Sequence, residues 1–150
     1  MTIGIDTSFL VAVECVEHLE YAASRELLAD LIAADERFAL NPDVLSEFIH
    51  TVTDPKRFPT PLSMLEALNR AEYWRTAGES TLVFPTSAST KLFFEWMIQF
   101  RLGRKRLRDT MLAASYFSEG VTRIVTLNAK DFRVFGCFEI IEPTPSSPPA

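Results

Sequence analysis

Glycine is scarce in this sequence, with five residues in 150. Three of the five follow expected helices and serve there as stop signals. The chain contains no GxSxG, P-loop or GxGxxG pattern. Such patterns supply the nucleophile turn of many hydrolases and the glycine-rich loops that cradle nucleotide phosphates. Their absence argues against both kinds of site.

Cysteine is equally scarce, with Cys15 and Cys137 far apart in the chain. Neither belongs to a CxxC pair or has a histidine at a ligand spacing, so the sequence shows no zinc motif. One disulfide is arithmetically possible. We expect two free, buried thiols in a reducing compartment instead.

No apolar run approaches the roughly 20 residues that a membrane span needs. The chain begins with the strand-like run Thr2–Ile5, without a basic region before it, so we expect no signal peptide and a cytoplasmic location. Apolar residues make up 47% and charged residues 23%, which fits one globular domain over residues 1–142. Residues 143–150 contain four prolines and two serines and are expected to form a disordered tail.

An excess of basic charge is also missing, because the net charge is −5. Nucleic-acid-binding domains commonly carry a basic patch and a high pI. Such a function here would require the basic residues to gather in one place and some acidic residues to serve a metal ion.

Short apolar strands alternate with helices along the chain. We expect strands at 3–5, 38–40, 82–84, 124–126 and 138–141. Helices are expected from Phe9, over 21–37, from Pro42, from Thr60 to Gly78, and over 86–102 and 109–119. Short strands that are apolar on both faces and separated by helices predict a parallel sheet covered on both sides. The expected fold is an α/β three-layer sandwich with right-handed crossovers.

Four acidic residues from distant segments can reach one edge of this sheet. In open parallel sheets, ligands bind beyond the carboxyl ends of the strands. Taken singly, each acid has an ordinary structural explanation as a helix cap, a solvated helix position or a turn residue. Clustered carboxylates repel each other, and a hard cation such as Mg²⁺ removes that penalty through oxygen ligands. The four candidates are Asp6, Glu47, Asp109 and Asp131.

The segments around these acids resemble the PIN-domain ribonucleases, specifically the VapC-type toxins of bacterial toxin–antitoxin pairs. The resemblance covers nearly the whole chain except the tail, with the pieces in the same order and at similar spacing. It lies in residues 5–8, 44–48, 108–114 and 125–132, with a further similarity at 51–58 to one branch of these toxins.

This resemblance implies a PIN-like fold, cleavage of RNA, and a VapB-type antitoxin as partner. It implies a Mg²⁺ or Mn²⁺ site at Asp6, Glu47, Asp109 and Asp131, with Ser8 supporting Asp6 by a hydrogen bond. Many members carry an aspartate where this chain has Asn128. Whether Asn128, Asp131 or both face the metal, and whether one or two ions bind, stays open.

A basic run leads directly into Asp109. Such a run is usually a solvated surface, but beside the proposed site we favour contact with RNA phosphates. Lys56, Arg57, Lys130 and Arg133 could extend it. The run consists of Arg101, Arg104, Lys105, Arg106 and Arg108.

The segment Leu92–Phe100 is apolar at seven of its nine positions. A helix that is apolar on most faces is buried on most faces. It is either a central core helix or a surface covered by a second subunit or an antitoxin. We expect the chain to form a homodimer.

Two other functions remain as alternatives. A haloacid-dehalogenase-type phosphatase also has an aspartate after its first strand, but it needs a second aspartate two residues later, where this chain has Ser8. A PIN fold kept only for binding would not need all four acids. We expect neither His18 nor His50 to be catalytic, and the sequence does not identify the RNA.

Overall fold

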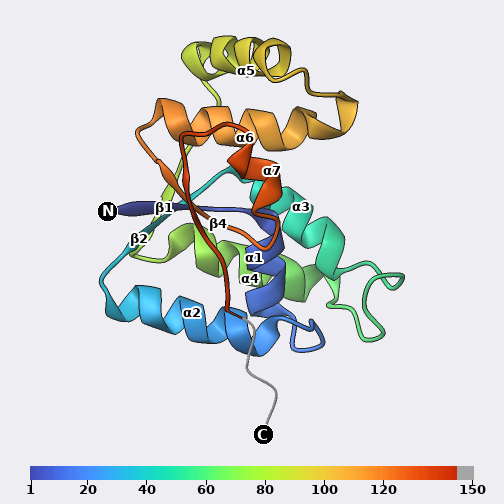
Figure 1. Ribbon diagram of the computed structural model, residues 1–150. Coiled ribbons are helices and arrows are strands. Elements are labelled where there is room, and N and C mark those ends of the chain that lie inside the picture. Colours follow the sequence, from blue (N-terminus) through green and yellow to red (C-terminus); the bar gives the residue numbers. More distant parts are fainter. Residues whose placement is uncertain (145–150) are drawn as a thin grey trace, which may run out of the picture.

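The computed structural model describes residues 1–144, which fold around a five-stranded, wholly parallel sheet in the order β3-β2-β1-β4-β5 (Figure 1). The predicted α/β class is confirmed. The strands are β1 (Thr2–Ile5), β2 (Arg37–Leu40), β3 (Ser80–Leu82), β4 (Arg123–Val125) and β5 (Glu139–Ile141).

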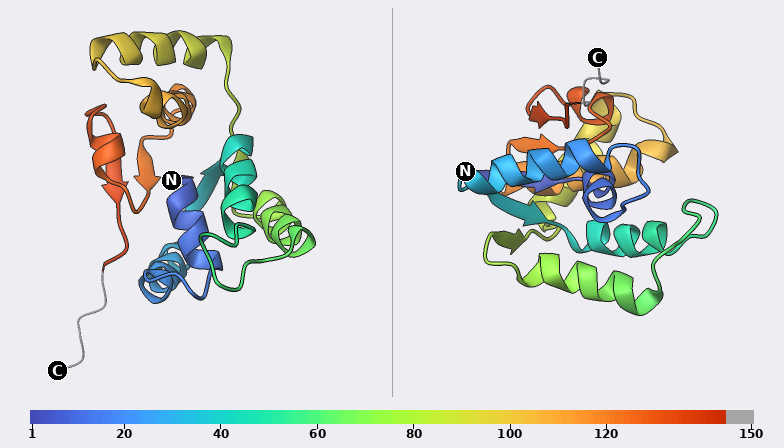
Figure 2. Two further views of the ribbon diagram at one scale, coloured as in Figure 1. Left: turned by 90° about the vertical axis from the view of Figure 1, so that its right-hand side faces the viewer. Right: turned by 90° about the horizontal axis from the view of Figure 1, so that it is seen from below.

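Helices cover both faces of the sheet, as Figures 1 and 2 show. The chain moves outward from β1 to β3, then returns across the sheet to β4 and β5. Because parallel crossovers are right-handed, this reversal places the later helices on the opposite face. One face carries α1 (Thr7–Glu14), α2 (Tyr21–Ala33), α3 (Pro42–Val52) and α4 (Met64–Thr76). The other carries α5 (Ser87–Gln99), the 3₁₀ turn η1 (Arg104–Arg106), α6 (Leu107–Ser118) and α7 (Lys130–Arg133).

Strand β1 lies at the centre of the core, and α6 packs closely against it. Gly4 permits this approach, because a Cβ atom there would lie 2.6 Å from the ring of Tyr116. The buried Tyr116 hydroxyl lies 2.7 Å from the carbonyl oxygen of Ile5 and 3.1 Å from that of Ala39. The phenol thus links the ends of β1 and β2, next to Asp6.

Several expected boundaries were wrong. Helix α2 ends at Ala33 rather than at residue 37, because Asp35 adopts a left-handed conformation (φ 60°) and Arg37 already belongs to β2. Helix α4 begins at Met64 rather than at Thr60, because Ser63 and Glu66 form a capping box that satisfies the free N–H groups there. Strand β3 spans Ser80–Leu82 rather than 82–84, since pairing with β2 sets its register, with Ala39 opposite Thr81. The Ser63-x-x-Glu66 signature was present in the sequence and was missed, whereas the register of β3 depends on its pairing with β2.

Helix α5 and its connection to α6 also differ from expectation. Helix α5 ends at Gln99, and Arg101 adopts a left-handed conformation (φ 53°) before Gly103. Helix α6 begins at Leu107, so Asp109 lies inside its first turn rather than at its start. An acid in the first turn interacts favourably with the helix dipole.

The apolar residues of α5 divide between core and surface. Trp96 is buried and stacks on Phe135, with ring centroids 4.7 Å apart. On the outside, Phe94 and Ile98 are 61% and 79% exposed. Helix α5 packs on α6 and is the outermost helix of this face (Figure 2). It is therefore neither a central core helix nor fully covered within this chain.

Cys15 and Cys137 are both free thiols, as expected, but only Cys15 is buried, and Cys137 is half-buried. Most of the predicted tail, 145–150, lies outside the described residues. Within the described part of the chain, no helix combines the length and apolar character that crossing a membrane requires.

Candidate active site

The site forms between β1 and β4, where the order in which the chain adds strands to the sheet reverses. The connections from these neighbouring strands leave toward opposite faces, which opens a crevice at their carboxyl ends. Asp6 directly follows β1, and Thr126 directly follows β4. The two residues therefore meet at the base of the crevice although 120 positions separate them.

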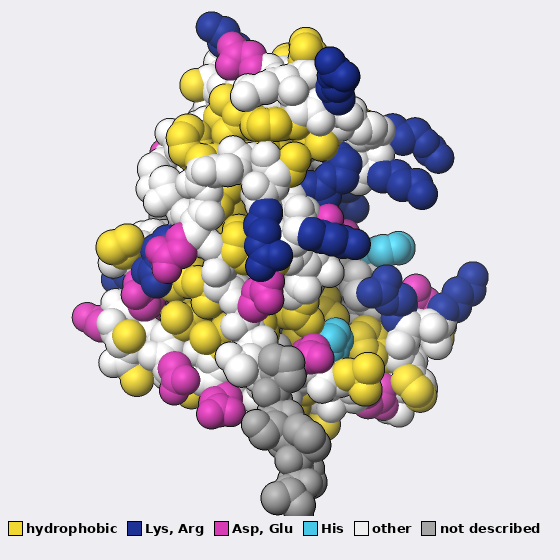
Figure 3. All heavy atoms as spheres, in the orientation of Figure 1, with side chains coloured by type: hydrophobic (Ala, Val, Ile, Leu, Met, Phe, Trp, Pro, Cys, Tyr) yellow, Lys and Arg dark blue, Asp and Glu magenta, His cyan; other side chains and the backbone are white. Residues whose placement is uncertain are grey.

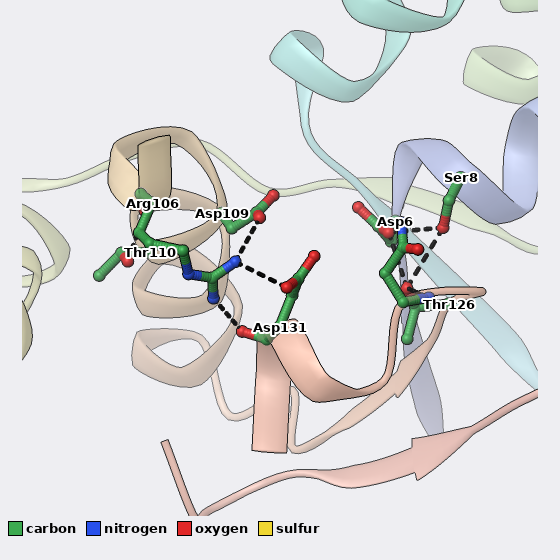
Figure 4. A network of polar contacts seen from close by, with 8 residues as sticks. Asp6, Ser8, Arg106, Asp109, Thr110, Thr126 and Asp131 are labelled. Carbon is green, nitrogen blue, oxygen red and sulfur yellow. Dashed lines mark hydrogen bonds and ion pairs between the residues drawn. The ribbon is translucent and has the colours of Figure 1, made fainter. Parts of the chain in front are cut away.

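Two hydroxyl groups hold the Asp6 carboxylate (Figure 4). Ser8 Oγ donates to Asp6 Oδ2 over 2.6 Å, and Thr126 Oγ1 donates to the same oxygen over 2.7 Å. Each hydroxyl also accepts a backbone N–H, from Leu127 at 3.0 Å for Ser8 and from Asn128 at 2.9 Å for Thr126. These N–H groups direct both hydroxyl protons toward Asp6.

Asp6 is only 6% exposed. Burial raises the pKa of its carboxyl group, although the hydrogen bonds from Ser8 and Thr126 oppose the shift. The negative charge of ionised Asp6 is therefore only partly stabilised by the neighbouring groups of this chain. Such a group is more stable when a cation approaches it.

Glu47 reaches the same crevice from α3. Thr7 Oγ1 donates to Glu47 Oε2 over 3.2 Å, and Arg108 Nη2 lies 3.4 Å from that oxygen. Arg108 also binds both carboxylate oxygens of Asp43, at 3.0 to 3.2 Å. Thr7 and Arg108 thus orient Glu47 from two sides.

Asp109 and Asp131 both bind the guanidinium group of Arg106 (Figure 4). Arg106 Nη1 lies 2.8 Å from Asp109 Oδ2 and 3.1 Å from Asp131 Oδ1, and Arg106 also donates to the backbone carbonyl of Asp131. Burial raises the pKa of Asp109 to about 6, with the nearby Asp6 as the next cause. Asp131 and Glu47 act in the same direction, while Arg106 opposes them.

These groups line a hollow of about 410 Å³. The sequence-predicted acids Asp6, Glu47, Asp109 and Asp131 all lie on its wall, and so do Ser8 and Asn128. The structure therefore brings together all six residues that were expected to form the site. Both Asn128 and Asp131 line the hollow, so the choice between them stays open.

The donor set consists of carboxylate, hydroxyl and amide oxygens beside a histidine at the edge, which fits a hard cation such as Mg²⁺. In residues 1–144, no three His, Cys, Asp or Glu side chains are arranged to hold one ion together. Mg²⁺ takes only one or two protein carboxylates and keeps several waters. The raised pKa values of Asp6 and Asp109 are the observation that favours a cation here.

The basic run divides into two parts. Arg106 and Arg108 bind acids of the site, which sequence reasoning did not anticipate. Arg101, Arg104 and Lys105 are exposed and form no ion pair within the described part of the chain. Contact with RNA thus stays a prediction for the run. The three exposed residues without an ion pair are the ones available to bind phosphate.

Sequence reasoning also missed Thr126, Thr7 and His18, whereas Arg57 was named as a possible extension of the basic run and does line the hollow. For Thr126 a signal existed, because it follows β4 as Asp6 follows β1. The spacing of Arg106 and Asp109, three residues apart on one helical turn, was a second available signal. His18 lies in a loop and had no such signal.

We predict that the metal-free protein loses stability as pH rises through the titration range of Asp109. Its pKa in the folded chain is about 6, against an ordinary value of 3.8. Between these values the folded state binds more protons than the unfolded state, so the free energy of unfolding falls as pH increases. Asp109→Asn removes this contribution. Its stability advantage over the parent, measured by denaturant unfolding in EDTA, should grow across this range and level off above it. An advantage that is independent of pH would contradict the assignment.

Comparison with family models finds no match, and no curated protein matches the chain either. Several solved structures share its architecture. VapC20 of Mycobacterium tuberculosis, described as a toxin that cleaves the sarcin–ricin loop, has a TM-score of 0.69 and 18% identity, with 91% of this chain and 97% of that chain covered.

Two VapBC structures give similar values. VapBC-1 of nontypeable Haemophilus influenzae has a TM-score of 0.68 and 13% identity over 95% of this chain and 98% of that chain. VapBC2 of Rickettsia felis, bound to a promoter DNA fragment, has a TM-score of 0.64 and 17% identity over 95% and 98%. At these identities the comparison establishes architecture, and the chain has the PIN-type α/β fold of these proteins, as its sequence resemblance implied.

Proposed function

We propose that this chain is a metal-dependent endoribonuclease that acts as the toxin of a toxin–antitoxin pair. The observation that carries the proposal is the buried carboxylate of Asp6, fixed by Ser8 and Thr126 and facing Asp109, whose pKa is raised to about 6. A fold neighbour described as a sarcin–ricin-loop-cleaving toxin supports the same reading.

In this proposal Asp6, Glu47, Asp109 and Asp131 would surround Mg²⁺ or Mn²⁺, with one or two of these carboxylates as direct ligands and the others acting through bound water. When bound, the ion lowers the pKa of a coordinated water and neutralises charge that builds on the phosphodiester. Ser8 and Thr126 keep Asp6 oriented, while Thr7 and Arg108 keep Glu47 oriented. Arg106 neutralises part of the charge of Asp109 and Asp131 and bridges their carboxylates through Nη1.

The test is cleavage of total RNA by the purified chain, with Mg²⁺ or Mn²⁺ added and with EDTA as control. Fragments that form only with the divalent ion support the proposal. If RNA stays intact under all conditions, the nuclease proposal is wrong and the alternative of a PIN fold that only binds is favoured.

The exposed basic residues should hold the RNA backbone without affecting the metal. Lys and Arg side chains that contact phosphates release counterions, so binding weakens as salt rises. We predict that Arg104→Ala with Lys105→Ala lowers affinity for all RNAs alike and reduces the salt slope by about 0.7 for each lost phosphate contact on a single strand. RNA binding is measured across a salt series in a cleavage-dead Asp6→Asn background. Unchanged affinity and slope would make these residues ordinary solvated side chains.

The partners follow from the same proposal. Two of the fold neighbours are VapBC structures, which supports an antitoxin of the VapB type for this chain. The outward face of α5, with Phe94 and Ile98, is one apolar surface that a partner could cover. The homodimer and the cytoplasmic location stay predictions.

A further inference from the structure

Two residues that line the hollow, His18 and Arg57, are not acids, and we call the part that they line its second wall. His18 and Arg57 line it from two loops, one after α1 and one after α3. The loops are joined by a hydrogen bond from Thr60 N to Glu17 Oε2, over 3.4 Å. Neither His18 nor Arg57 forms a hydrogen bond or ion pair with Asp6 or Glu47 in the described residues, so both remain available to bind a ligand.

Arg57 is presented by a well-anchored turn. Lys56 N donates to Asp54 Oδ1 over 2.9 Å, and Arg57 N donates to the Asp54 carbonyl over 3.0 Å. Phe58, directly after Arg57, is 8% exposed and belongs to the core. The Arg57 side chain is exposed and forms no ion pair with any residue from 1 to 144. An arginine at the edge of an acidic hollow with no protein acid bound is available to an anion from outside.

His18 offers a neutral donor beside it. Its Nδ1 accepts the backbone N–H of Glu20 over 3.0 Å, which assigns the ring proton to Nε2. Burial lowers the pKa of His18, Arg57 lowers it further, and Glu20 opposes the shift. The neutral ring therefore presents one N–H donor and no competing acceptor at Nε2.

We propose that Arg57 and His18 form a phosphate-binding subsite for a single RNA strand, a role that rests on the proposed ribonuclease function. Arg57 supplies the charge, and His18 Nε2–H donates to an oxygen of the same phosphate. Basic side chains gather on the edge where Figure 1 places both the connection before α6 and the loop after α3 (Figure 3). The strand is thus held on both sides of the acids, by Arg104 and Lys105 at one flank and by Arg57 and His18 at the other.

The experiment measures binding of a short single-stranded RNA to the full chain carrying Asp6→Asn, across a salt series. Arg57→Gln should weaken binding about tenfold, the effect of losing a hydrogen bond to a charged group. It should also reduce the salt slope by about 0.7, the value for one phosphate contact on a single strand. His18→Ala should weaken binding about fivefold and leave the slope unchanged, because the lost donor is neutral. His18→Gln retains an N–H donor and should recover part of the loss.

Arg75→Gln is the matched control, since Arg75 is exposed, is paired with Glu72 on α4 and does not line the hollow. It makes the same change of charge and should leave affinity and slope at the parent values. Unfolding midpoints equal to that of the parent show that the loops are intact. If Arg57→Gln binds RNA like Arg75→Gln, the subsite is wrong while the ribonuclease proposal stands. If the Asp6→Asn chain binds no RNA at all, the result contradicts both the subsite and the proposed function.

Discussion

Replacing Asp6 with asparagine should abolish RNA cleavage while leaving the fold intact. Asp6 is the only one of the four acids that is nearly fully buried, and two hydroxyls fix its orientation. Removing an outer partner of a metal ligand typically costs 10- to 100-fold in metal affinity or activity, so loss of a ligand should cost at least about 100-fold. The measurement is the initial rate of RNA cleavage at saturating Mn²⁺.

The same variant should be at least as stable as the parent in the absence of metal. The asparagine oxygen still accepts from Ser8 and Thr126, while the buried charge that raises the pKa of Asp6 is gone. Asp30→Asn, on the exposed side of α2, is the control for a simple change of charge. If the Asp6→Asn chain cleaved RNA at the parental rate, the assignment of Asp6 to the catalytic site would be wrong.

Chelation of divalent ions should have an effect as large as that substitution. Every acid of the hollow raises the pKa of Asp109, so without a cation the carboxylates repel each other and offer nothing to activate a water. We expect cleavage to disappear in EDTA and to return when Mg²⁺ or Mn²⁺ is added in excess. The unfolding midpoint at neutral pH should rise with the added ion, because binding to the folded state stabilises it.

The Asp109→Asn variant, measured under the same conditions, separates stabilisation by a bound ion from general stabilisation by salt. Its midpoint should respond less to Mn²⁺ than that of the parent, at equal ionic strength. Undiminished cutting in excess EDTA would exclude the mechanism, whatever the response of the midpoint.

Much of the fold could be predicted because its signals are local. Short apolar strands separated by helices indicate a parallel sheet, and the cap Asn41 before Pro42 marks the start of α3. The start of α4 was missed although Ser63 and Glu66 carry the capping-box signature, whereas the bounds of β3 could not be placed because its register with β2 decides them. Likewise, the apolar stretch of α5 did not show which side would be covered, because Phe135 and Phe138, which pack on Trp96, come from the far end of the chain.

The site was predictable to the extent that topology alone assembles it. Asp6 and the residues after β4 follow neighbouring strands, so their convergence follows from the sheet order. The pairing of Arg106 with both Asp109 and Asp131 depends on where α7 packs against α6, which a sequence pattern does not contain. The places of His18 and Arg57 depend on loop paths fixed by tertiary contacts such as the buried Phe58.

The central claim is that this hollow uses a divalent ion to hydrolyse RNA with water, and labelled solvent tests it most directly. Total RNA is incubated with the purified chain and Mg²⁺ in water enriched in heavy oxygen, and the new fragment ends are analysed by mass spectrometry. Attack by a water molecule predicts linear phosphate ends that carry one solvent oxygen, and no fragments in EDTA. Cyclic phosphate ends, formed by attack of the ribose hydroxyl, or the same fragments in EDTA, would contradict the account.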